Sequence, residues 1–337
     1  MNVKCKINTK ENKMKRFLSL FVALISVACF NMSYAGVGEG YGIITISVAQ
    51  MHTKPDFSSE LDTQALLGTP IRVLADEGWY KVQTPDNYQA WTHHKSVYLA
   101  TRAEVIAWNE AEKVVVTSHY AFCYSAPVIG AIPVSDVVAG CRLKLIGTKG
   151  KFYVVEYPDG RRGYLEKKVA MPLEKWRKRL KQDAESILAT AKTLMGVPYL
   201  WSGMSSKAVD CSGFVRTVLF LHDIIIPRNA SQQAKTGDLI EIAQNFSNLQ
   251  PGDLIFFGRK ASETQKERVS HVGISLGGAR FIHSQGDVHI SSFDEVDPLF
   301  DAYNLGRLMY ARRVLPYINK VPELNTTDVN PYYASNF

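Results

Sequence analysis

Two features of other protein classes are missing from the 337-residue sequence. Beyond residue 35, no apolar run approaches the roughly 18 residues of a membrane-spanning helix, so we expect no membrane span there. The sequence contains no CxxC or HxxxH pair of the kind that zinc sites usually include. We therefore expect neither a metal ion nor another cofactor.

A basic surplus is also missing from most of the chain. The formal net charge is +7, but residues 1–35 hold six Lys or Arg and one Glu, which leaves about +2 for the rest. Nucleic-acid binding needs a basic patch on a folded domain, so we expect no nucleic-acid partner. A content of 46% hydrophobic and 21% charged residues is typical of a globular protein, and the length favours two or three domains.

The N-terminus has the layout of a secretory signal. In "MKRFLSLFVALISVACFNMSYA" two basic residues precede an apolar run over residues 17–30, and the small residues Ser33 and Ala35 come before Gly36. We predict that residues 1–35 are a signal peptide and that the protein is exported to the periplasm or cell envelope. Lipid attachment at Cys29 is the alternative, although no bulky aliphatic residue stands three positions before it.

Residues 36–172 show the same pattern twice. "WYKVQTPDNYQAW" and "FYVVEYPDGRRGY" each contain a strand-like segment, a Pro-Asp turn and a second aromatic segment. Two all-β units of about 60 residues are therefore predicted, at 36–112 and 113–172. Each resembles the bacterial SH3-like domain, a small barrel.

The pattern changes after residue 172. "LEKWRKRLKQDAESILATAKTLMGV" reads as one helical segment that ends at Gly196, and its apolar face includes Leu194 and Met195. Short strands follow "PGD" at 251–253. We predict an α+β domain over residues 173–317 and a loose polar tail over residues 318–337.

Cys211 opens an apolar helical run in "DCSGF". A helix N-terminus lowers the pKa of a thiol through its unpaired N–H groups and the helix dipole, so we expect an activated thiolate. His271 lies in "SHVGISLG", and His283 lies twelve residues later in "RFIHSQG". Two strands of a hairpin would place the two imidazoles side by side. Cys211, His271 and His283 are then nucleophile, base and orienting group.

The other two cysteines of the exported part, Cys123 and Cys141, lie on neighbouring strand-like segments. In an oxidising compartment they can form a disulfide. Two separate half-buried thiols are the alternative.

The order "DCSGF", "PGDLIFF", "SHVGISLG" and "FIHSQG" resembles the NlpC-type family of cell-wall cysteine peptidases, which have a papain-like fold and a Cys–His–His triad. With two SH3-like units ahead of it, the chain is similar to the γ-D-glutamyl-L-diamino-acid endopeptidases of the dipeptidyl-peptidase VI type. The resemblance implies hydrolysis after D-Glu in L-Ala-γ-D-Glu-diamino-acid stem peptides with a free alanine amine, by a monomer.

The resemblance also implies further site residues. Tyr199 corresponds to the tyrosine that helps the Cys211 N–H bind the oxyanion. The residues that surround the substrate correspond to Asp62, Tyr88, Trp201, Asp210, Ser212 and Asn229. Two positions depart from the family pattern, because Asp62 replaces a glutamate and Asn229 replaces an aspartate. A neutral amide can hydrogen-bond an ammonium but does not offset its charge.

Two other functions remain open. One is a non-catalytic wall-binding module, which the intact Cys211, His271 and His283 disfavour. The other is an amidase or acyltransferase on the same scaffold, since a triad determines acyl-enzyme chemistry but not the acyl group.

The predicted signal generates a first test. N-terminal sequencing of the exported protein should give a mature chain that begins near Gly36, or at Cys29 if that residue is acylated. A start at Met1 or Met14 in the exported fraction would contradict the prediction.

Overall fold

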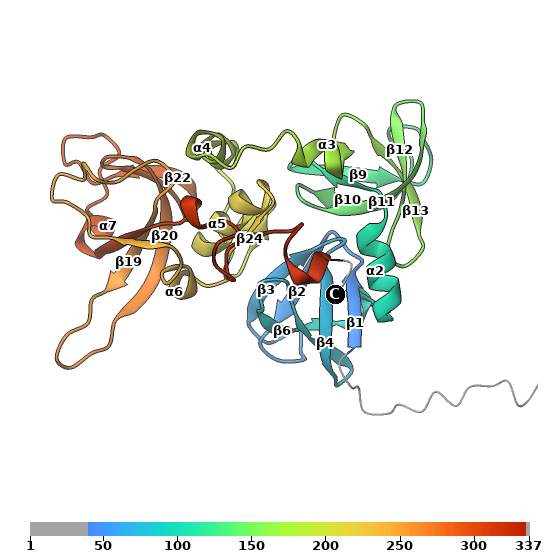
Figure 1. Cartoon of the computed structure of the whole chain (residues 1–337), viewed down its shortest axis with the longest axis horizontal. Helices are drawn as coiled ribbons and strands as arrows, with labels where there is room; N and C mark the ends of the chain where they lie inside the picture. The colour runs from blue at the N-terminus through green and yellow to red at the C-terminus, as the bar shows by residue number, and fades with distance from the viewer. Residues whose placement is uncertain (1–39, 335–337) are drawn as a thin grey trace, which may run out of the picture. The chain divides into compact units, whose positions relative to one another are not determined.

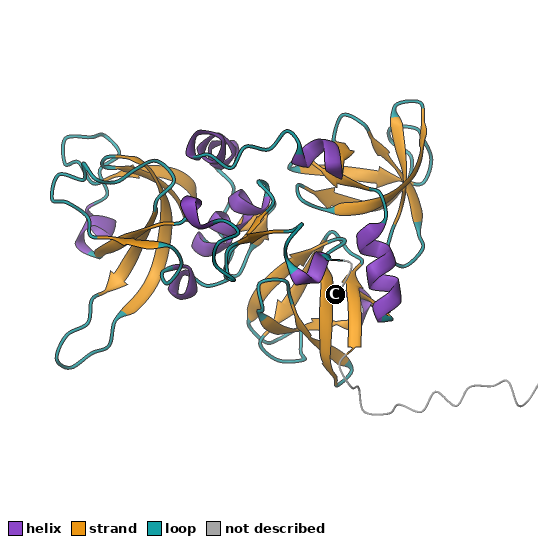
Figure 2. Cartoon of the chain, viewed as in Figure 1, coloured by secondary structure: helices purple, strands orange, loops and turns teal. Residues whose placement is uncertain are grey.

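The computed structural model describes residues 40–334. The predicted signal peptide and Cys29 therefore lie outside the described residues. Two β-units come first, and a C-terminal unit follows from residue 173 (Figure 1). Strands make up most of both β-units, whereas the C-terminal unit combines helices and strands (Figure 2). Within residues 40–334, no helix has both the length and the apolar character that crossing a bilayer requires.

The first β-unit is one antiparallel sheet with the strand order β3-β2-β6-β5-β4-β1-β7. Its strands are β1 (Gly40–Ile44), β2 (Val48–His52), β3 (Leu61–Leu66), β4 (Pro70–Asp76), β5 (Trp79–Gln83), β6 (Gln89–His93) and β7 (Val97–Ala100). Small and β-branched residues such as Ala49, Ile71 and Val82 form its core. Helix α2 (Arg102–Glu110), which the sequence analysis missed, follows with a capping box between Thr101 and Glu104.

The second β-unit repeats this topology strand for strand, in the order β10-β9-β13-β12-β11-β8-β14. Its strands are β8 (Lys113–Val116), β9 (Tyr120–Tyr124), β10 (Pro133–Val138), β11 (Arg142–Lys149), β12 (Phe152–Glu156), β13 (Arg162–Glu166) and β14 (Ala170–Pro172). The prediction of two all-β units is confirmed. Among the described strands, no pairing joins the ends of either sheet, so we describe them as sheets and not as closed barrels.

Cys123 and Cys141 do not form the disulfide that the sequence allowed, and both are buried free thiols. Their sulfurs have different neighbours. The Cys123 sulfur lies beside Gly163, where no Cβ would fit. The Cys141 thiol donates to the carbonyl oxygen of Ser47 at 3.3 Å. The alternative of two separate thiols is therefore the one observed.

The C-terminal unit contains a six-stranded sheet in the order β18-β23-β19-β20-β21-β22. These strands are β18 (Asp238–Ile240), β19 (Leu254–Arg259), β20 (Arg268–Gly277), β21 (Arg280–Gln285), β22 (Asp287–Ser292) and β23 (Leu308–Arg313). The helices are α3 (Leu173–Arg177), α4 (Ala184–Thr193), α5 (Cys211–Phe220), α6 (Ala230–Gln233) and α7 (Ala302–Gly306). Phe214 and Val218 of α5 share a buried cluster with Val272 of β20, so α5 packs on this sheet. The predicted α+β architecture is confirmed.

The single predicted helix over residues 173–197 is wrong in its length. The structure has α3 and α4 with a break between them, because Asp183 caps α4 by accepting the N–H of Ser186 at 2.8 Å. Met195, predicted on the apolar face, lies beyond α4 and is 45% exposed.

The interpretation of residues 318–337 as a loose tail is also wrong for the described part. Strand β24 (Asn325–Thr326) pairs with β17 (Ile224–Ile225). The Asn330 side chain donates to the carbonyl oxygen of Pro85 at 3.0 Å, and Tyr332 donates to Gln83 at 2.8 Å. This segment therefore connects the C-terminal unit to the first β-unit.

A buried charge cluster connects the second β-unit, α3 and the end of α5. The Asp223 carboxylate accepts bonds from Arg142 at 2.7 Å, from Arg177 at 3.1 Å and from Thr327 at 2.6 Å. Asp223 and Arg142 are almost completely buried. The charge on Asp223 thus compensates two arginines from different parts of the chain.

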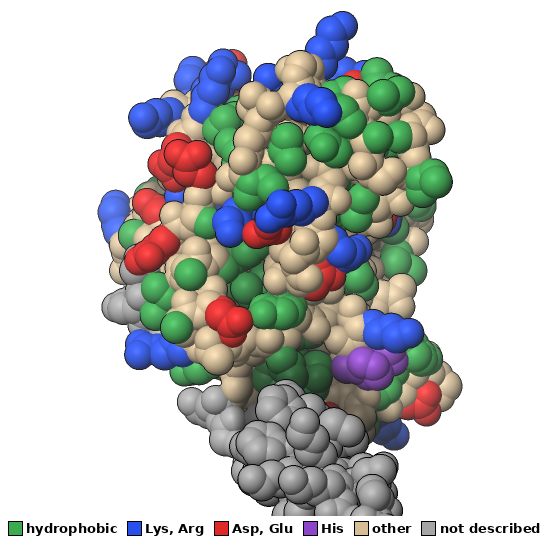
Figure 3. Space-filling view, turned by 90° about the vertical axis from the view of Figure 1, so that its right-hand side faces the viewer, with side chains coloured by type: hydrophobic (Ala, Val, Ile, Leu, Met, Phe, Trp, Pro, Cys, Tyr) green, Lys and Arg blue, Asp and Glu red, His purple; other side chains and the backbone are tan. Residues whose placement is uncertain are grey.

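On the face shown in Figure 3, Lys and Arg side chains gather toward the top of the view, and below them Lys, Arg, Asp and Glu side chains are mixed with hydrophobic ones.

The Asp223 cluster generates a second test. Asp223→Ala leaves Arg142 and Arg177 without their buried partner, so urea unfolding should show a loss of about 3–5 kcal/mol. The matched control is Glu174→Ala, which removes a partner of Arg177 that is 72% exposed and should cost at most about 1 kcal/mol. Equal small effects of both substitutions would show that the cluster contributes little to stability.

Candidate active site

Cys211 is the first residue of α5, and Asp210 is the N-cap of that helix. The Asp210 carboxylate accepts the N–H of Gly213 at 2.6 Å and the N–H of Ser202 at 3.0 Å. Only glycine fits at position 213, because a Cβ there would lie 1.9 Å from the carbonyl oxygen of Gly203. The sequence around Cys211 thus holds the start of the helix tightly against the preceding loop.

Asp210 also forms a buried ion pair with Arg228 at 2.6 Å. The same guanidinium donates to Ser212 at 2.8 Å and to Thr63 of the first β-unit at 3.2 Å. Arg228 is 2% exposed. The carboxylate of Asp210 and the hydroxyl of Ser212 therefore also position the start of α5, and their predicted role in substrate binding stays a prediction.

His271 and His283 lie on the adjacent antiparallel strands β20 and β21, as the hairpin argument predicted. His271 Nε2 lies 2.8 Å from His283 Nδ1, and both rings are buried. The thiol of Cys211 lies within hydrogen-bonding reach of the N–H of Val272, the residue that follows His271. The structure thus brings the thiol next to the strand that carries the first histidine.

Ser291 and Asp301, which were not predicted from the sequence, extend the chain of polar contacts beyond His283. His283 Nε2 lies 3.0 Å from the Ser291 hydroxyl, and the Asp301 carboxylate lies within hydrogen-bonding reach of the same hydroxyl. Burial raises the pKa of Asp301, but hydrogen bonds from Asn304 and Ser291 outweigh this effect and lower it overall. Asp301 is therefore an ionised acceptor.

This chain of groups assigns the tautomers. A carboxylate only accepts, so Ser291 donates to Asp301 and accepts from Nε2–H of His283. Nδ1 of His283 is then unprotonated and accepts Nε2–H of His271. His271 Nδ1 remains as the nitrogen that can take a proton, which is the form that a general base requires.

The resting protonation state differs from the one expected. Burial raises the pKa of the Cys211 thiol to about 11, and the charge of Asp210 adds to this, against the lowering effect of the N–H groups of Val272 and Ser212. Burial, followed by the neighbouring His283, holds the pKa of His271 well below its usual value. These shifts favour a neutral thiol and a neutral imidazole at rest, in contrast to the expected thiolate.

Tyr199 and Trp201 lie in the loop before α5. Tyr199 is half-buried, and burial, followed by the charges of Cys211 and Asp210, raises the pKa of its phenol to about 12. It is therefore a protonated donor near the thiol. Trp201 is 59% exposed and presents its indole to solvent.

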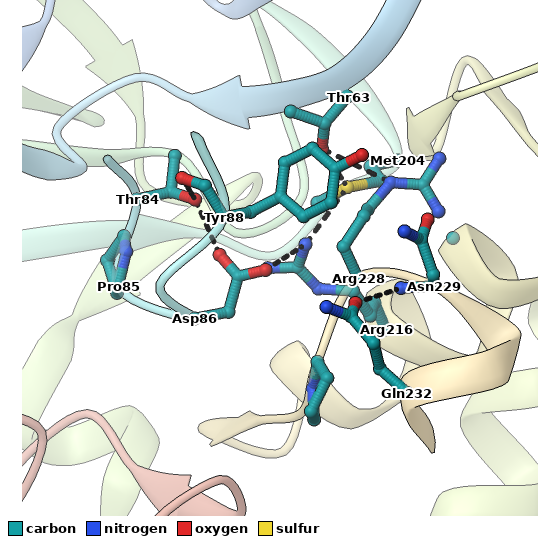
Figure 4. Close-up of polar contacts among 12 residues, drawn as sticks. Thr63, Thr84, Pro85, Asp86, Tyr88, Met204, Arg216, Arg228, Asn229 and Gln232 are labelled. Atoms are coloured by element: carbon teal, nitrogen blue, oxygen red, sulfur yellow. Dashed lines mark hydrogen bonds and ion pairs between the residues drawn. The ribbon is translucent and has the colours of Figure 1, made fainter. Parts of the chain in front are cut away.

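The three remaining predicted residues meet at the junction of the first β-unit and α6. Tyr88 donates to Asp62 at 2.7 Å, and the side chain of Asn229 lies within hydrogen-bonding reach of Tyr88. Tyr88 comes from the first β-unit, and Asn229 comes from the C-terminal unit beside Arg228 (Figure 4). Burial, followed by the bond to Asp62, raises the pKa of Tyr88 to about 12. The cluster offers one carboxylate and two neutral polar groups.

Further contacts hold this junction together (Figure 4). The side chain of Gln64 accepts the N–H of Met204 at 2.8 Å. Asp86, whose side chain is 1% exposed, forms an ion pair with Arg216 of α5 at 3.1 Å. The first β-unit therefore packs directly against the helix that carries Cys211.

Among residues 40–334, no group of three or more His, Cys, Asp or Glu side chains is arranged to hold a metal ion.

Comparisons with known proteins show what the two parts of the chain are similar to. A model of the NlpC/P60 family matches residues 196–312, and a model described as the bacterial dipeptidyl-peptidase Sh3 domain matches residues 51–97. A protein of Bacillus cereus named gamma-D-glutamyl-L-lysine dipeptidyl-peptidase is 31% identical over 268 residues, which are 77% of each chain. Dipeptidyl-peptidase 6 of Lysinibacillus sphaericus is 25% identical over 268 residues, 77% of this chain and 93% of that protein.

Among solved structures, the chain is similar to the crystal structure of an NlpC/P60 family protein from Bacillus cereus. The two are 26% identical with a TM-score of 0.67, and the match covers 82% of this chain and all of that one. The likeness therefore extends over the β-units as well as the C-terminal unit.

The raised pKa of Cys211 generates a third test. Iodoacetamide reacts with the thiolate, so the alkylation rate of substrate-free protein should rise about tenfold per pH unit between roughly pH 6 and pH 9. Cys211→Ala protein corrects for reaction at the buried Cys123 and Cys141. A rate that stays constant from about pH 5 to pH 8 would instead indicate a preformed thiolate–imidazolium pair.

Proposed function

The chain belongs to the NlpC/P60 family of cysteine peptidases, and from this premise we propose that it hydrolyses the γ-D-Glu–diamino-acid bond of peptidoglycan stem peptides that carry a free N-terminal L-Ala. The observation that carries the proposal is the meeting of Asp62 and Tyr88 with Asn229 beside the helix of Cys211. A carboxylate in a half-buried polar pocket suits an ammonium group.

The contact between the two units suggests a limit on substrate length. The first β-unit packs against α5 through Asp86 and Arg216, and Asp62 belongs to the same β-unit. We propose that this β-unit blocks the space before an L-Ala whose amine pairs with Asp62. The D-Glu of such a peptide then lies next to Cys211, and the exposed indole of Trp201 can cover the peptide.

Acylation begins with proton transfer from the Cys211 thiol to Nδ1 of His271. The thiolate attacks the γ-carbonyl carbon of D-Glu, and the carbonyl oxygen becomes an oxyanion. The N–H of Cys211, one of the first N–H groups of α5 that lack an intrahelical acceptor, and the phenol of Tyr199, which is protonated and near Cys211, then donate to the oxyanion. The C–N bond then breaks, and His271 gives its proton to the amine of the leaving diamino acid.

Deacylation reverses these roles. His271 takes a proton from water, the resulting hydroxide equivalent attacks the thioester carbonyl, and the C–S bond breaks. The proton returns to the Cys211 sulfur, so the products are L-Ala-D-Glu and the resting thiol. His283, Ser291 and Asp301 keep Nε2 of His271 protonated throughout, so that only Nδ1 exchanges a proton.

We also propose that the enzyme acts outside the cytoplasm, in the periplasm or cell envelope. This proposal rests on the signal pattern of residues 1–35 and on the wall-derived substrate.

Paired substrates test the function. Wild-type protein should cleave L-Ala-γ-D-Glu-diaminopimelate, and Cys211→Ala should abolish the cleavage. Asp62→Ala removes a charge-assisted bond to the ammonium, so kcat/KM for the free-amine peptide should fall roughly tenfold to a hundredfold. The value of kcat/KM for the N-acetylated peptide should change little. Product formation is followed by mass spectrometry.

The matched control is Asp56→Ala, which removes an exposed carboxylate of the same β-unit that bonds only Ser58 in its own turn. It should leave kcat/KM for both substrates unchanged. If Asp62→Ala lowers kcat/KM equally for both substrates, Asp62 is a structural residue and the proposed preference for a free amine is wrong. Activity retained by Cys211→Ala would contradict the nucleophile assignment.

A further inference from the structure

Arg307 is a cation close to the triad that the proposed function does not use. It lies between α7 and β23, and its side chain is half-buried. Within residues 40–334, no Asp or Glu carboxylate lies within 4.0 Å of its guanidinium. The neighbouring Asp301 is instead bonded by Asn304 and Ser291. Arg307 therefore keeps a positive charge without an ion-pair partner.

Hydrogen bonds to two side chains hold the guanidinium in place. Nε and Nη2 both donate to Asn304 Oδ1, at 3.0 Å and 2.7 Å, and Nη1 lies 3.4 Å from the Ser270 hydroxyl. The group also lies over the rings of Tyr303 at 4.6 Å and Phe257 at 5.7 Å. Asn304 itself is buried, so this orientation is preorganised.

The hydrogen bonds of Arg307 leave part of its guanidinium available to a ligand. A guanidinium has five N–H donors, and Asn304 and Ser270 account for three of them. One N–H on Nη1 and one on Nη2 remain. A guanidinium can bind a carboxylate through two such N–H groups.

The contacts of Arg307 place it beside the catalytic histidine and away from the amine pocket. Phe257, under the guanidinium, is the cross-strand partner of His271, and their ring centroids are 5.4 Å apart. The charge of Arg307 contributes to the lowered pKa values of His271 and His283. The residues that touch Arg307 all belong to the C-terminal unit, whereas Asp62 and Tyr88 belong to the first β-unit.

A peptide with its amine at Asp62 and its γ-carbonyl at Cys211 must extend its leaving residue away from the first β-unit. We propose that Arg307 binds the α-carboxylate of this leaving diamino acid, an inference that rests on the proposed function. The enzyme then recognises a short peptide by both ends, the ammonium at Asp62 and the carboxylate at Arg307. Stem peptides that continue beyond the diamino acid carry an amide at this place and lose the second contact.

The test compares L-Ala-γ-D-Glu-L-Lys with its C-terminal amide, because lysine carries no second carboxylate. Wild-type enzyme should prefer the free acid in kcat/KM by roughly tenfold to a hundredfold. In Arg307→Gln this ratio should fall to about one. Arg307→Lys keeps the charge but not the two N–H groups of a guanidinium, so its ratio should lie between the two. Thermal unfolding checks that each variant is folded.

The control is Arg259→Gln, which removes an exposed arginine from β19 of the same sheet and should leave the ratio unchanged. A wild-type ratio near one, or the same ratio in wild type, Arg307→Gln and Arg307→Lys, would overturn the role of Arg307 while the peptidase function stands. If wild-type enzyme cleaves neither peptide nor its diaminopimelate counterpart, the proposed function fails and this inference fails with it.

Discussion

The buried ion pair between Asp210 and Arg228 is the interaction on which the rest of the site depends. Asp210 caps the helix that begins with Cys211, and Arg228 continues from Asp210 to Thr63 of the first β-unit. Removal of one partner from a buried pair typically costs about 3–5 kcal/mol, because the other charge is left uncompensated. One pair therefore both orients the nucleophile helix and fixes the β-unit that closes the cleft. Docking of that unit and placement of the thiol are two consequences of the same contact.

Much of this organisation could be predicted from the sequence because it is local or follows from hairpin geometry. Cys211 follows a cap residue, and His271 and His283 lie on strands joined by a short turn. The break between α3 and α4 was also readable, since Asp183 is a helix-capping residue inside an apparently continuous helical pattern. What could not be predicted depends on tertiary contacts. The polar residues 318–334 resemble a free tail in composition, yet Thr327 is completely buried against Asp223.

The residues that the sequence analysis missed share a physical cause. Arg228, Asp301 and Arg307 are charged residues that no local pattern distinguishes from solvated ones. Each has a role only because of contacts made in the folded protein. Arg228 pairs with Asp210, and Asp301 accepts a hydrogen bond from Ser291. Arg307 donates to Asn304 and lies over the ring of Phe257. Asp210 and Ser212 were predicted to bind substrate because they flank the nucleophile, and the structure adds that both bind Arg228. Their position in the sequence identified the region but not this partner.

We propose that one site, shared by the first β-unit and the C-terminal unit, binds a peptide with a free amine. A crystal structure of Cys211→Ala protein with L-Ala-γ-D-Glu-L-Lys bound tests this proposal. We expect the alanine ammonium within about 3 Å of the Asp62 carboxylate and the γ-carbonyl of D-Glu facing the position of the missing sulfur. A peptide whose amine points into solvent, with Asp62 bonded only to Tyr88, would contradict it.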